Sequence, residues 1–478
     1  MRSQPNILWI CTDQQRYDTL HWTGNKQIST PNIDQLGRTG VSFTQAYCQS
    51  PICTPSRSSF LTGRYPSSVH GCLNGNDKWA RAAPLVTDLL SAHNYETGLI
   101  GKLHLAGTFG RTEPGLDDAY DWVRWSSVPL DLWPEGHNYA EWVRSKGSDL
   151  SALASPPEGD NYAWSVIPGI PTELHQSTWC ADMAGQFVRE RTDSDRPWLL
   201  SVNPFDPHPP FDPPKEYLDR YMNRELSPPL FAQSDLENQA ALSGVDFQTV
   251  LRDPSQVDVI AIKAAYYAMV ELLDSMVGTI INALEETGQR DDTIVIFCSD
   301  HGEMLGDHGL MLKGCRFYEG LVRVPLIVSW PRQVRQGERD ESLVELIDIV
   351  PTLLEAVGID AARGMQGKSL FSRLSGTTSP TEVHREYARC EYYRSLNAEW
   401  RPHFEGSYGT MLRDSRYKIS SYHGHDFGEL YDLHNDPFEF ENLWKSQQHR
   451  DIREHLIRES FDRLAFAVDV GPEQTVRW

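Results

Sequence analysis

The hydrophobic residues of the chain form two patterns. They occur either in short uninterrupted runs or in longer stretches where they recur at the spacing of a helix. Hydrophobic residues recur at steps of three and four between residues 262 and 284, and Gly288 ends this stripe. That spacing predicts a long amphipathic helix. Five apolar runs bounded by turn residues predict buried strands at Asn6–Thr12, 97–100, 198–202, 293–298 and 325–329. Strands alternating with helices predict an α/β fold, with a large, mostly parallel sheet sandwiched by helices.

Polar residues follow three of these predicted strands. Asp13-Gln14 comes after the first, residues 203–211 come after 198–202, and Asp300-His301 comes after 293–298. In parallel sheets, ligands bind beyond the carboxyl ends of the strands. We therefore expect these residues to share one site.

The remaining segments have a different character. Pro- and Trp-rich stretches near 106–175 and 204–256 predict loops over the rim of that site, with few regular elements. After residue 365, short alternating segments and a final helix near 450–466 predict a smaller α+β unit with a short antiparallel sheet. We expect a catalytic domain over 1–365 and a C-terminal subdomain over 366–478.

Charge and cysteine usage narrow the class of protein. The 478 residues carry 66 acidic and 44 basic side chains, a net charge of -22, which argues against nucleic acid as a partner. The net negative charge does not exclude a small anionic ester as substrate, because a pocket lined by cationic groups can bind it within an acidic protein. We see no signal-peptide pattern and no apolar run near the ~20 residues that a membrane span needs. Eight scattered cysteines favour the cytoplasm. The tail at 471–478 predicts either a docking segment of a homo-oligomer or a frayed end.

One stretch carries the most specific chemical signal. Residues 51–64 read PICTPSRSSFLTGR, which resembles the sulfatase signature at every position. In that family a formylglycine-generating maturation enzyme converts the cysteine to Cα-formylglycine, so the resemblance implies that Cys53 is the nucleophile. It also implies an alkaline-phosphatase-like fold. Arg57, which is always charged, would hold the alkoxide.

The modification makes chemical sense. A thiol or hydroxyl is a poor nucleophile until it is activated. A hydrated aldehyde carries two hydroxyls on one carbon. One attacks the sulfur, and the other later loses its proton and collapses the hemiacetal, which expels sulfate.

The same resemblance implies a metal site at Asp13, Gln14, Asp300 and His301, beside the modified Cys53. Oxygen donors suit Ca²⁺, whereas an imidazole ligand favours Mn²⁺, so we expect one divalent ion of either kind. Most sulfatases have Asp-Asp at the first pair. A glutamine at this position also occurs in phosphonate monoester hydrolases of the same superfamily.

Further motifs supply candidate substrate contacts. Gly101-Lys102-Leu103-His104 resembles the second sulfatase signature, which implies that Lys102 binds sulfate and that His104 is the base for hemiacetal collapse. His208 lies between prolines that stiffen the backbone, and with Lys313 it would serve the leaving oxygen. The alternatives are a packed loop histidine and a solvated lysine.

Weaker candidates complete the set. Asn74 either donates a hydrogen bond to the substrate anion or belongs to a plain turn. Residues expected to support the site or to be structural are Glu303, Asp307 and His308, and those expected to shape the pocket are His423 and His425.

These observations favour a sulfuric ester hydrolase acting on an aryl, alkyl or sugar sulfate. The alternative with the same nucleophile is a phosphonate monoester or phosphodiester hydrolase. A third hypothesis is an anion-binding protein without catalytic activity. The absence of formylglycine in protein from its native host would support it.

Overall fold

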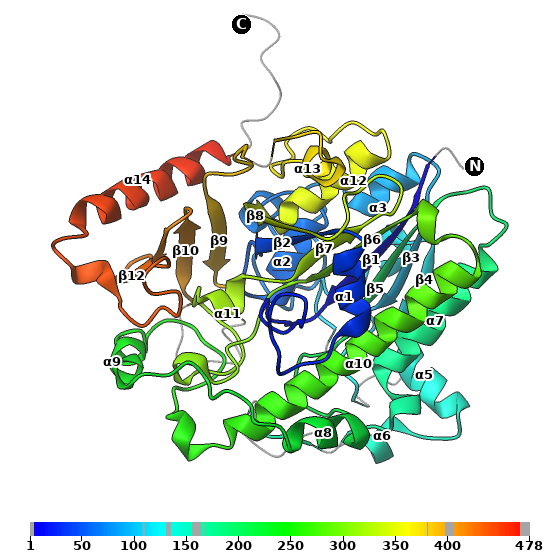
Figure 1. Cartoon of the computed structure of the whole chain (residues 1–478), viewed down its shortest axis with the longest axis horizontal. Helices are drawn as coiled ribbons and strands as arrows, with labels where there is room; N and C mark the ends of the chain where they lie inside the picture. The colour runs from blue at the N-terminus through cyan, green and yellow to red at the C-terminus, as the bar shows by residue number, and fades with distance from the viewer. Residues whose placement is uncertain are drawn as a thin grey trace, which may run out of the picture.

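The computed structural model describes residues 4–468 except 109, 131–134, 155–163, 168, 380 and 397–405. Its main feature is an eight-stranded sheet in the order β4-β3-β5-β1-β6-β7-β2-β8 (Figure 1). The strands are β1(Asn6–Thr12), β2(Val41–Tyr47), β3(Glu96–Gly101), β4(Trp122–Trp125), β5(Trp198–Asn203), β6(Thr293–Ser299), β7(Leu326–Ser329) and β8(Glu338–Glu345). Only β7 among these runs antiparallel to its neighbours, which confirms the mostly parallel sheet.

Helices cover both faces of this sheet, because successive side chains of each buried strand point to opposite sides. In β1, Ile7 and Trp9 join one apolar core, while Leu8 and Ile10 join the other. The first core is completed by α2(Cys53–Phe60), α3(Val86–Ser91), α12(Ile349–Ala356) and α13(Phe371–Ser375). The second is completed by α1(Pro31–Arg38), α5(Asn138–Ser145), α7(Gln176–Glu190) and α10(Val259–Glu286) (Figure 1).

The predicted long helix is α10, which spans 28 residues. By length and composition alone it would also suffice to cross a membrane. Its most apolar window is 78% buried within the protein, however, so its apolar surface is used in the core.

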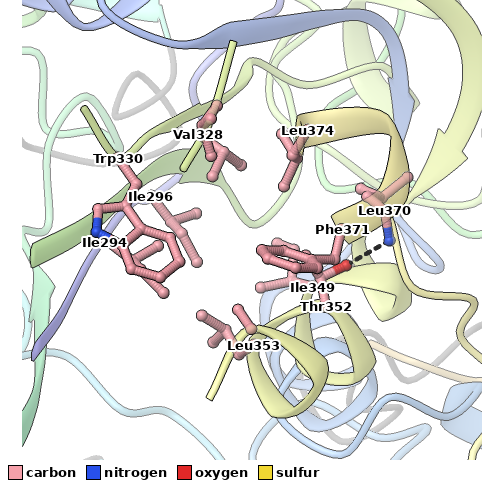
Figure 2. A pocket seen from close by; sticks show the side chains of 12 residues that line it. Ile294, Ile296, Val328, Trp330, Ile349, Thr352, Leu353, Leu370, Phe371 and Leu374 are labelled. Atoms are coloured by element: carbon pink, nitrogen blue, oxygen red, sulfur yellow. Dashed lines mark hydrogen bonds between the residues drawn. The ribbon is translucent and has the colours of Figure 1, made fainter. Parts of the chain in front are cut away.

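A small apolar pocket lies between the sheet and the helices α12 and α13 (Figure 2). Ile296 and Val328 line it from β6 and β7, and Leu353 and Phe371 line it from the helices. None of the predicted site residues lines it. We therefore assign this pocket to core packing.

Several elements differ from the predictions. The stretches expected to be loops contain β4, α5, α8(Lys215–Met222) and α9(Gln233–Ala241), so that expectation was wrong there. β4 and β8 are the two edge strands. β4 is only four residues long, and the first half of β8 is polar and largely exposed, so neither has the pattern of a buried strand.

The C-terminal part forms a second, antiparallel sheet in the order β12-β11-β10-β9, as predicted. Its elements are β9(Ala388–Tyr393), β10(Tyr408–Arg413), β11(Tyr417–Tyr422), β12(Gly428–Asp432) and the final helix α14(Arg450–Phe466). Cys390 and Met411 of this sheet pack into the same core as β1. The division at residue 365 stays a prediction, and the tail at 471–478 lies outside the described residues.

Candidate active site

The predicted metal ligands meet at the carboxyl ends of two neighbouring strands. Thr12 of β1 pairs with Ser299 of β6, so Asp13 and Asp300 come next to each other. Asp13, Gln14, Asp300 and His301 are all fully buried. The sheet register therefore assembles this half of the site.

Cys53 joins these residues as the first residue of α2. Its Sγ lies 3.1 Å from Nε2 of His301 and 3.7 Å from Oδ1 of Asp13. One potential ligand atom from each of Asp13, Cys53, Asp300 and His301 falls within 4.8 Å of the others. The predicted nucleophile and the predicted metal ligands thus form one cluster.

Hydrogen bonds orient the ligand groups. Nδ1 of His301 lies 2.9 Å from the carbonyl oxygen of Gly302, so Nε2 faces the cluster. Oδ1 of Asp300 accepts from the backbone N–H of Gln14 at 3.0 Å and of His301 at 2.9 Å. The donor set of carboxylate, amide and imidazole fits one divalent cation, as the sequence predicted.

Three buried cations surround the cluster. Nε of Arg57 donates to Oδ2 of Asp300 at 2.8 Å, and Lys102 forms an ion pair with Asp13. Nζ of Lys313 lies 2.9 Å from Sγ of Cys53. Arg57 and Lys102 are paired with buried carboxylates, where breaking one pair leaves an uncompensated charge.

One donor of Arg57 remains available. Its Nη1 donates to the carbonyl oxygen of Lys102 at 3.1 Å. Its Nη2 lies 3.7 Å from Asp13 and makes no hydrogen bond within the described part of the chain. A buried guanidinium nitrogen of this kind is suited to an oxyanion.

The cations also change the acidity of Cys53. Burial and the Asp13 carboxylate raise the pKa of the thiol, while Lys102, Lys313 and His301 lower it. The balance leaves the pKa below its usual value. The environment of Cys53 therefore favours negative charge at this position.

His104 stands on the loop that follows β3, and Glu113 fixes this loop. The buried Glu113 carboxylate accepts hydrogen bonds from the backbone N–H groups of His104 at 2.7 Å, Leu105 at 2.5 Å and Ala106 at 2.9 Å. His104 has a left-handed backbone with φ 59°. Burial, with help from Lys102, lowers the pKa of His104 well below its usual value, so the ring is neutral and able to accept a proton.

Sequence reasoning missed Glu113. It stands nine residues after His104 in a loop that has no regular pattern, and no motif marks it. Only the folded backbone brings its carboxylate to three N–H groups at once.

His208 approaches from the segment after β5. Its Nδ1 lies 2.6 Å from the carbonyl oxygen of Pro209, and its ring lies 4.5 Å from that of Phe205. Burial, with help from Lys313, lowers the pKa of His208, and Asp13 opposes that shift. The sequence analysis assigned His208 and Lys313 to the same leaving oxygen. In the structure the charge of Lys313 acts on both His208 and Cys53, because it lowers the pKa of each.

Asn74 has a structural contact. Its Oδ1 accepts from the backbone N–H of Thr54 at 3.3 Å and from the Thr54 hydroxyl at 2.8 Å. Ile52, the N-cap residue of α2, offers no capping side chain, so Asn74 supplies a cap from another segment. Its predicted hydrogen bond to substrate stays a prediction.

The supporting residues separate into two groups. Glu303 contacts Gln14 directly. Asp307 pairs with Arg16 at 2.8 Å, and His308 pairs with Asp235 at 2.9 Å, so both have structural contacts. Two histidines lie at the C-terminal sheet, where His423 contacts Thr410 and His425 contacts Phe427. Their predicted role in shaping the pocket stays a prediction.

Comparison with known proteins identifies the family. The model of the Sulfatase family matches residues 5–359, which is most of the chain. The chain belongs to the sulfatase family. A second family model, N-sulphoglucosamine sulphohydrolase, C-terminal, matches residues 306–465 of this sulfatase-family protein.

Relatives of this sulfatase-family protein span its whole length. It is 29% identical over 495 residues to an arylsulfatase of Clostridium perfringens, covering 95% of this chain and 94% of the relative. It is 29% identical over 501 residues to a choline-sulfatase of Rhizobium meliloti, covering 99% and 90%. The phosphonate monoester hydrolase of Agrobacterium radiobacter has a similar structure, with a TM-score of 0.82 at 26% identity, covering 98% and 96%. These likenesses confirm the alkaline-phosphatase-like fold.

Proposed function

We propose that this protein is a sulfuric ester hydrolase whose nucleophile is Cys53 after conversion to Cα-formylglycine. The observation that carries the proposal is the position of Cys53. It starts a helix at the carboxyl edge of the sheet, within hydrogen-bonding distance of both Lys313 and His301. A buried cysteine with only a packing role needs no such neighbours.

The residues around Cys53 also fit one divalent cation. Asp13, Gln14, Asp300 and His301 would hold it; ligand atoms of Asp13, Asp300 and His301 lie with the Cys53 sulfur within 4.8 Å of one another. When bound, such a cation supplies positive charge that favours the ionised form of a neighbouring hydroxyl. Oxygen ligands and one imidazole suit Ca²⁺ or Mn²⁺.

The charge of the site selects an anion. Arg57, Lys102 and Lys313 place three positive charges beside the carboxylates of Asp13 and Asp300, and the carboxylate of Glu303 lies one hydrogen bond further away, on Gln14. Lys102 and Lys313 would hold the oxygens of the sulfate group. Fixed charges of this kind act most strongly where negative charge grows during the reaction.

The two histidines would move protons. His104 is neutral and accepts the proton when the hemiacetal collapses. His208 is also neutral in the free protein. An anionic substrate beside it raises its pKa, so the protonated ring donates to the leaving oxygen.

A phosphonate monoester hydrolase with the same nucleophile is the second candidate. Two observations favour it: Gln14 in place of the usual aspartate, and the similarity in structure to the Agrobacterium radiobacter enzyme. Both substrates are anions, so the positive charges of Arg57, Lys102 and Lys313 do not separate them. The relatives at 29% identity are named as sulfatases, and on that ground we propose the sulfate ester first.

One comparison of rates tests this order. Protein co-expressed with a formylglycine-generating enzyme is assayed with nitrophenyl sulfate and with a nitrophenyl phosphonate monoester. We expect the larger kcat/KM for the sulfate. A much larger value for the phosphonate would reverse the order, and loss of both activities in Cys53→Ala is the control for a shared nucleophile.

A further inference from the structure

Glu303 lies two residues beyond His301 and is fully buried. One of its carboxylate oxygens, Oε2, accepts a hydrogen bond from Nε2 of Gln14. The other, Oε1, accepts from the backbone N–H of Leu305 at 3.0 Å and from that of Leu312. The carboxylate thus connects Gln14 with the loop that carries Lys313.

The amide of Gln14 is held from both ends. Its nitrogen donates to Glu303, and its oxygen accepts from Nζ of Lys313 at 2.5 Å. An amide has one donor end and one acceptor end, whereas an ionised carboxylate only accepts and an ammonium only donates. With Glu303 on one side and Lys313 on the other, a single orientation of the amide satisfies both partners.

We propose that Glu303 is a positioning residue that fixes the Gln14 amide, so that Gln14 presents its oxygen to the cation site. The inference rests on the proposed function, because that function places a divalent cation between Asp13, Asp300 and His301. Such a cation takes oxygen ligands and has no use for an amide NH₂ group. A reversed amide would direct its NH₂ group at Lys313 and at the cation.

The pair also accounts for the unusual residue at position 14. Most members of the family carry a carboxylate there, and this chain carries a neutral amide. The missing carboxylate is present in Glu303, one hydrogen bond further from the cluster. An acidic residue at position 14 would face the Glu303 carboxylate directly, and two buried like charges in contact repel each other.

The decisive variant is Glu303→Gln, which keeps the size of the side chain. Its Oε1 still accepts from Leu305 and Leu312, but an NH₂ group then faces the NH₂ group of Gln14. If the new amide at position 303 turns, its NH₂ group faces the backbone N–H groups of Leu305 and Leu312. If the amide of Gln14 turns, its NH₂ group faces the ammonium group of Lys313. The exchange Gln14→Glu with Glu303→Gln restores one donor facing one acceptor, with unchanged net charge.

Two measurements on purified protein test the inference, and neither depends on activity. Calorimetric titration with Mn²⁺ and with Ca²⁺ gives the Kd of the cation. Thermal unfolding in EDTA gives the Tm of the cation-free protein. We expect Glu303→Gln to weaken cation binding about 10- to 100-fold, as loss of a group that orients a metal ligand does, and to lower Tm. We expect the exchanged pair to recover most of both losses.

Glu113→Gln is the matched control, because it alters another buried carboxylate that accepts three hydrogen bonds in the same site. It contacts none of the predicted metal ligands, so we expect its Kd for the cation to stay unchanged. An unchanged Kd and Tm in Glu303→Gln, or equal losses in Glu303→Gln and in the exchanged pair, would overturn the inference.

Failure of the proposed function would look different. In that case the unaltered protein binds neither cation, while the Tm values in EDTA still decide whether Gln14 and Glu303 act as a donor–acceptor pair. Rescue of Tm by the exchange would then support the pairing alone, and the assignment to a cation site would be wrong.

Discussion

The two halves of the site are held in different ways. Asp13 and Asp300 follow directly from β1 and β6, two adjacent strands of the parallel sheet, so the backbone ladder fixes their spacing. Lys102 likewise directly follows β3 and belongs with them, whereas His104 and His208 stand on segments beyond the strands. In these segments the backbone is held by hydrogen bonds to buried side chains such as Glu113, and not by pairing between strands. We call these the strand half and the loop half.

The halves also differ in charge. Burial lowers the pKa of His301 in the strand half, but Asp300 raises it, and the net pKa is above its usual value. In the loop half burial lowers the pKa of both histidines, His104 and His208. The strand half therefore concentrates fixed charge, and the loop half supplies neutral groups that exchange protons. Three predictions separate these roles, and a fourth tests a histidine outside both halves.

The largest effect is expected at the nucleophile, where the two halves meet. Cys53→Ala removes the group that we propose becomes formylglycine, and we expect kcat to fall by about 10⁴-fold or more. Assays with nitrophenyl sulfate measure this loss. Unfolding by denaturant is the control, since the small buried side chain should leave the fold intact. Turnover close to that of the unaltered protein would contradict the assignment.

The next effect tests the strand half. Arg57→Ala leaves the buried carboxylates of Asp13 and Asp300 without their shared guanidinium. We expect the free energy of unfolding to fall by about 3–5 kcal/mol, as loss of one partner of a buried ion pair does. Urea denaturation in EDTA measures it. Arg57→Lys should recover part of the loss, and equal stability of Arg57→Ala and the unaltered protein would show that the pairs contribute nothing.

A smaller effect is expected from the anchor of the loop half. Glu113→Gln replaces one acceptor oxygen by an NH₂ group, which faces at least one buried N–H of residues 104–106. We expect the free energy of unfolding to fall by about 1–3 kcal/mol, with a lower kcat because His104 is displaced. Unfolding and steady-state kinetics measure both. A change in KM alone would contradict a role through His104.

The smallest effect is a pH dependence outside both halves, at His137, a buried histidine that caps α5 by accepting a hydrogen bond from the backbone N–H of Ala140. Burial lowers the pKa of His137 to about 4, below the value of about 6.5 for a free histidine. Between these two values the unfolded chain binds the proton and the folded chain does not, so stability falls as pH falls. The slope from His137 is about 1 kcal/mol per pH unit. Denaturation of the unaltered protein and of His137→Gln between pH 7 and 4 measures it, and equal slopes would contradict this contribution.

The strand half was predictable from the sequence. Apolar runs mark β1 and β6, and Asp13 and Asp300 follow each run closely, so the rule for parallel sheets brings them together. Cys53 and Arg57 came from a contiguous motif. In each case the signal lies within a few consecutive residues.

The loop half was only partly predictable. His104 came from the short motif that also contains Lys102, but Glu113 has no signal in the sequence. The edge strand β4 has only four residues, and β8 begins with exposed charged residues, so neither has an apolar run that predicts a strand. Helices α8 and α9 lie in stretches whose prolines suggested loops. Which backbone groups a buried carboxylate such as Glu113 binds depends on which segments meet in the folded chain. No short stretch of the sequence indicates this.

The identity of residue 53 in the mature protein tests the central claim most directly. The tryptic peptide that spans residues 39–57 contains Cys48 and Cys53, and fragmentation by mass spectrometry separates the two. In protein co-expressed with a formylglycine-generating enzyme, we expect a loss of about 18 Da at Cys53 alone, as –CH₂SH becomes –CHO. An unmodified Cys53 in fully active protein would contradict the account.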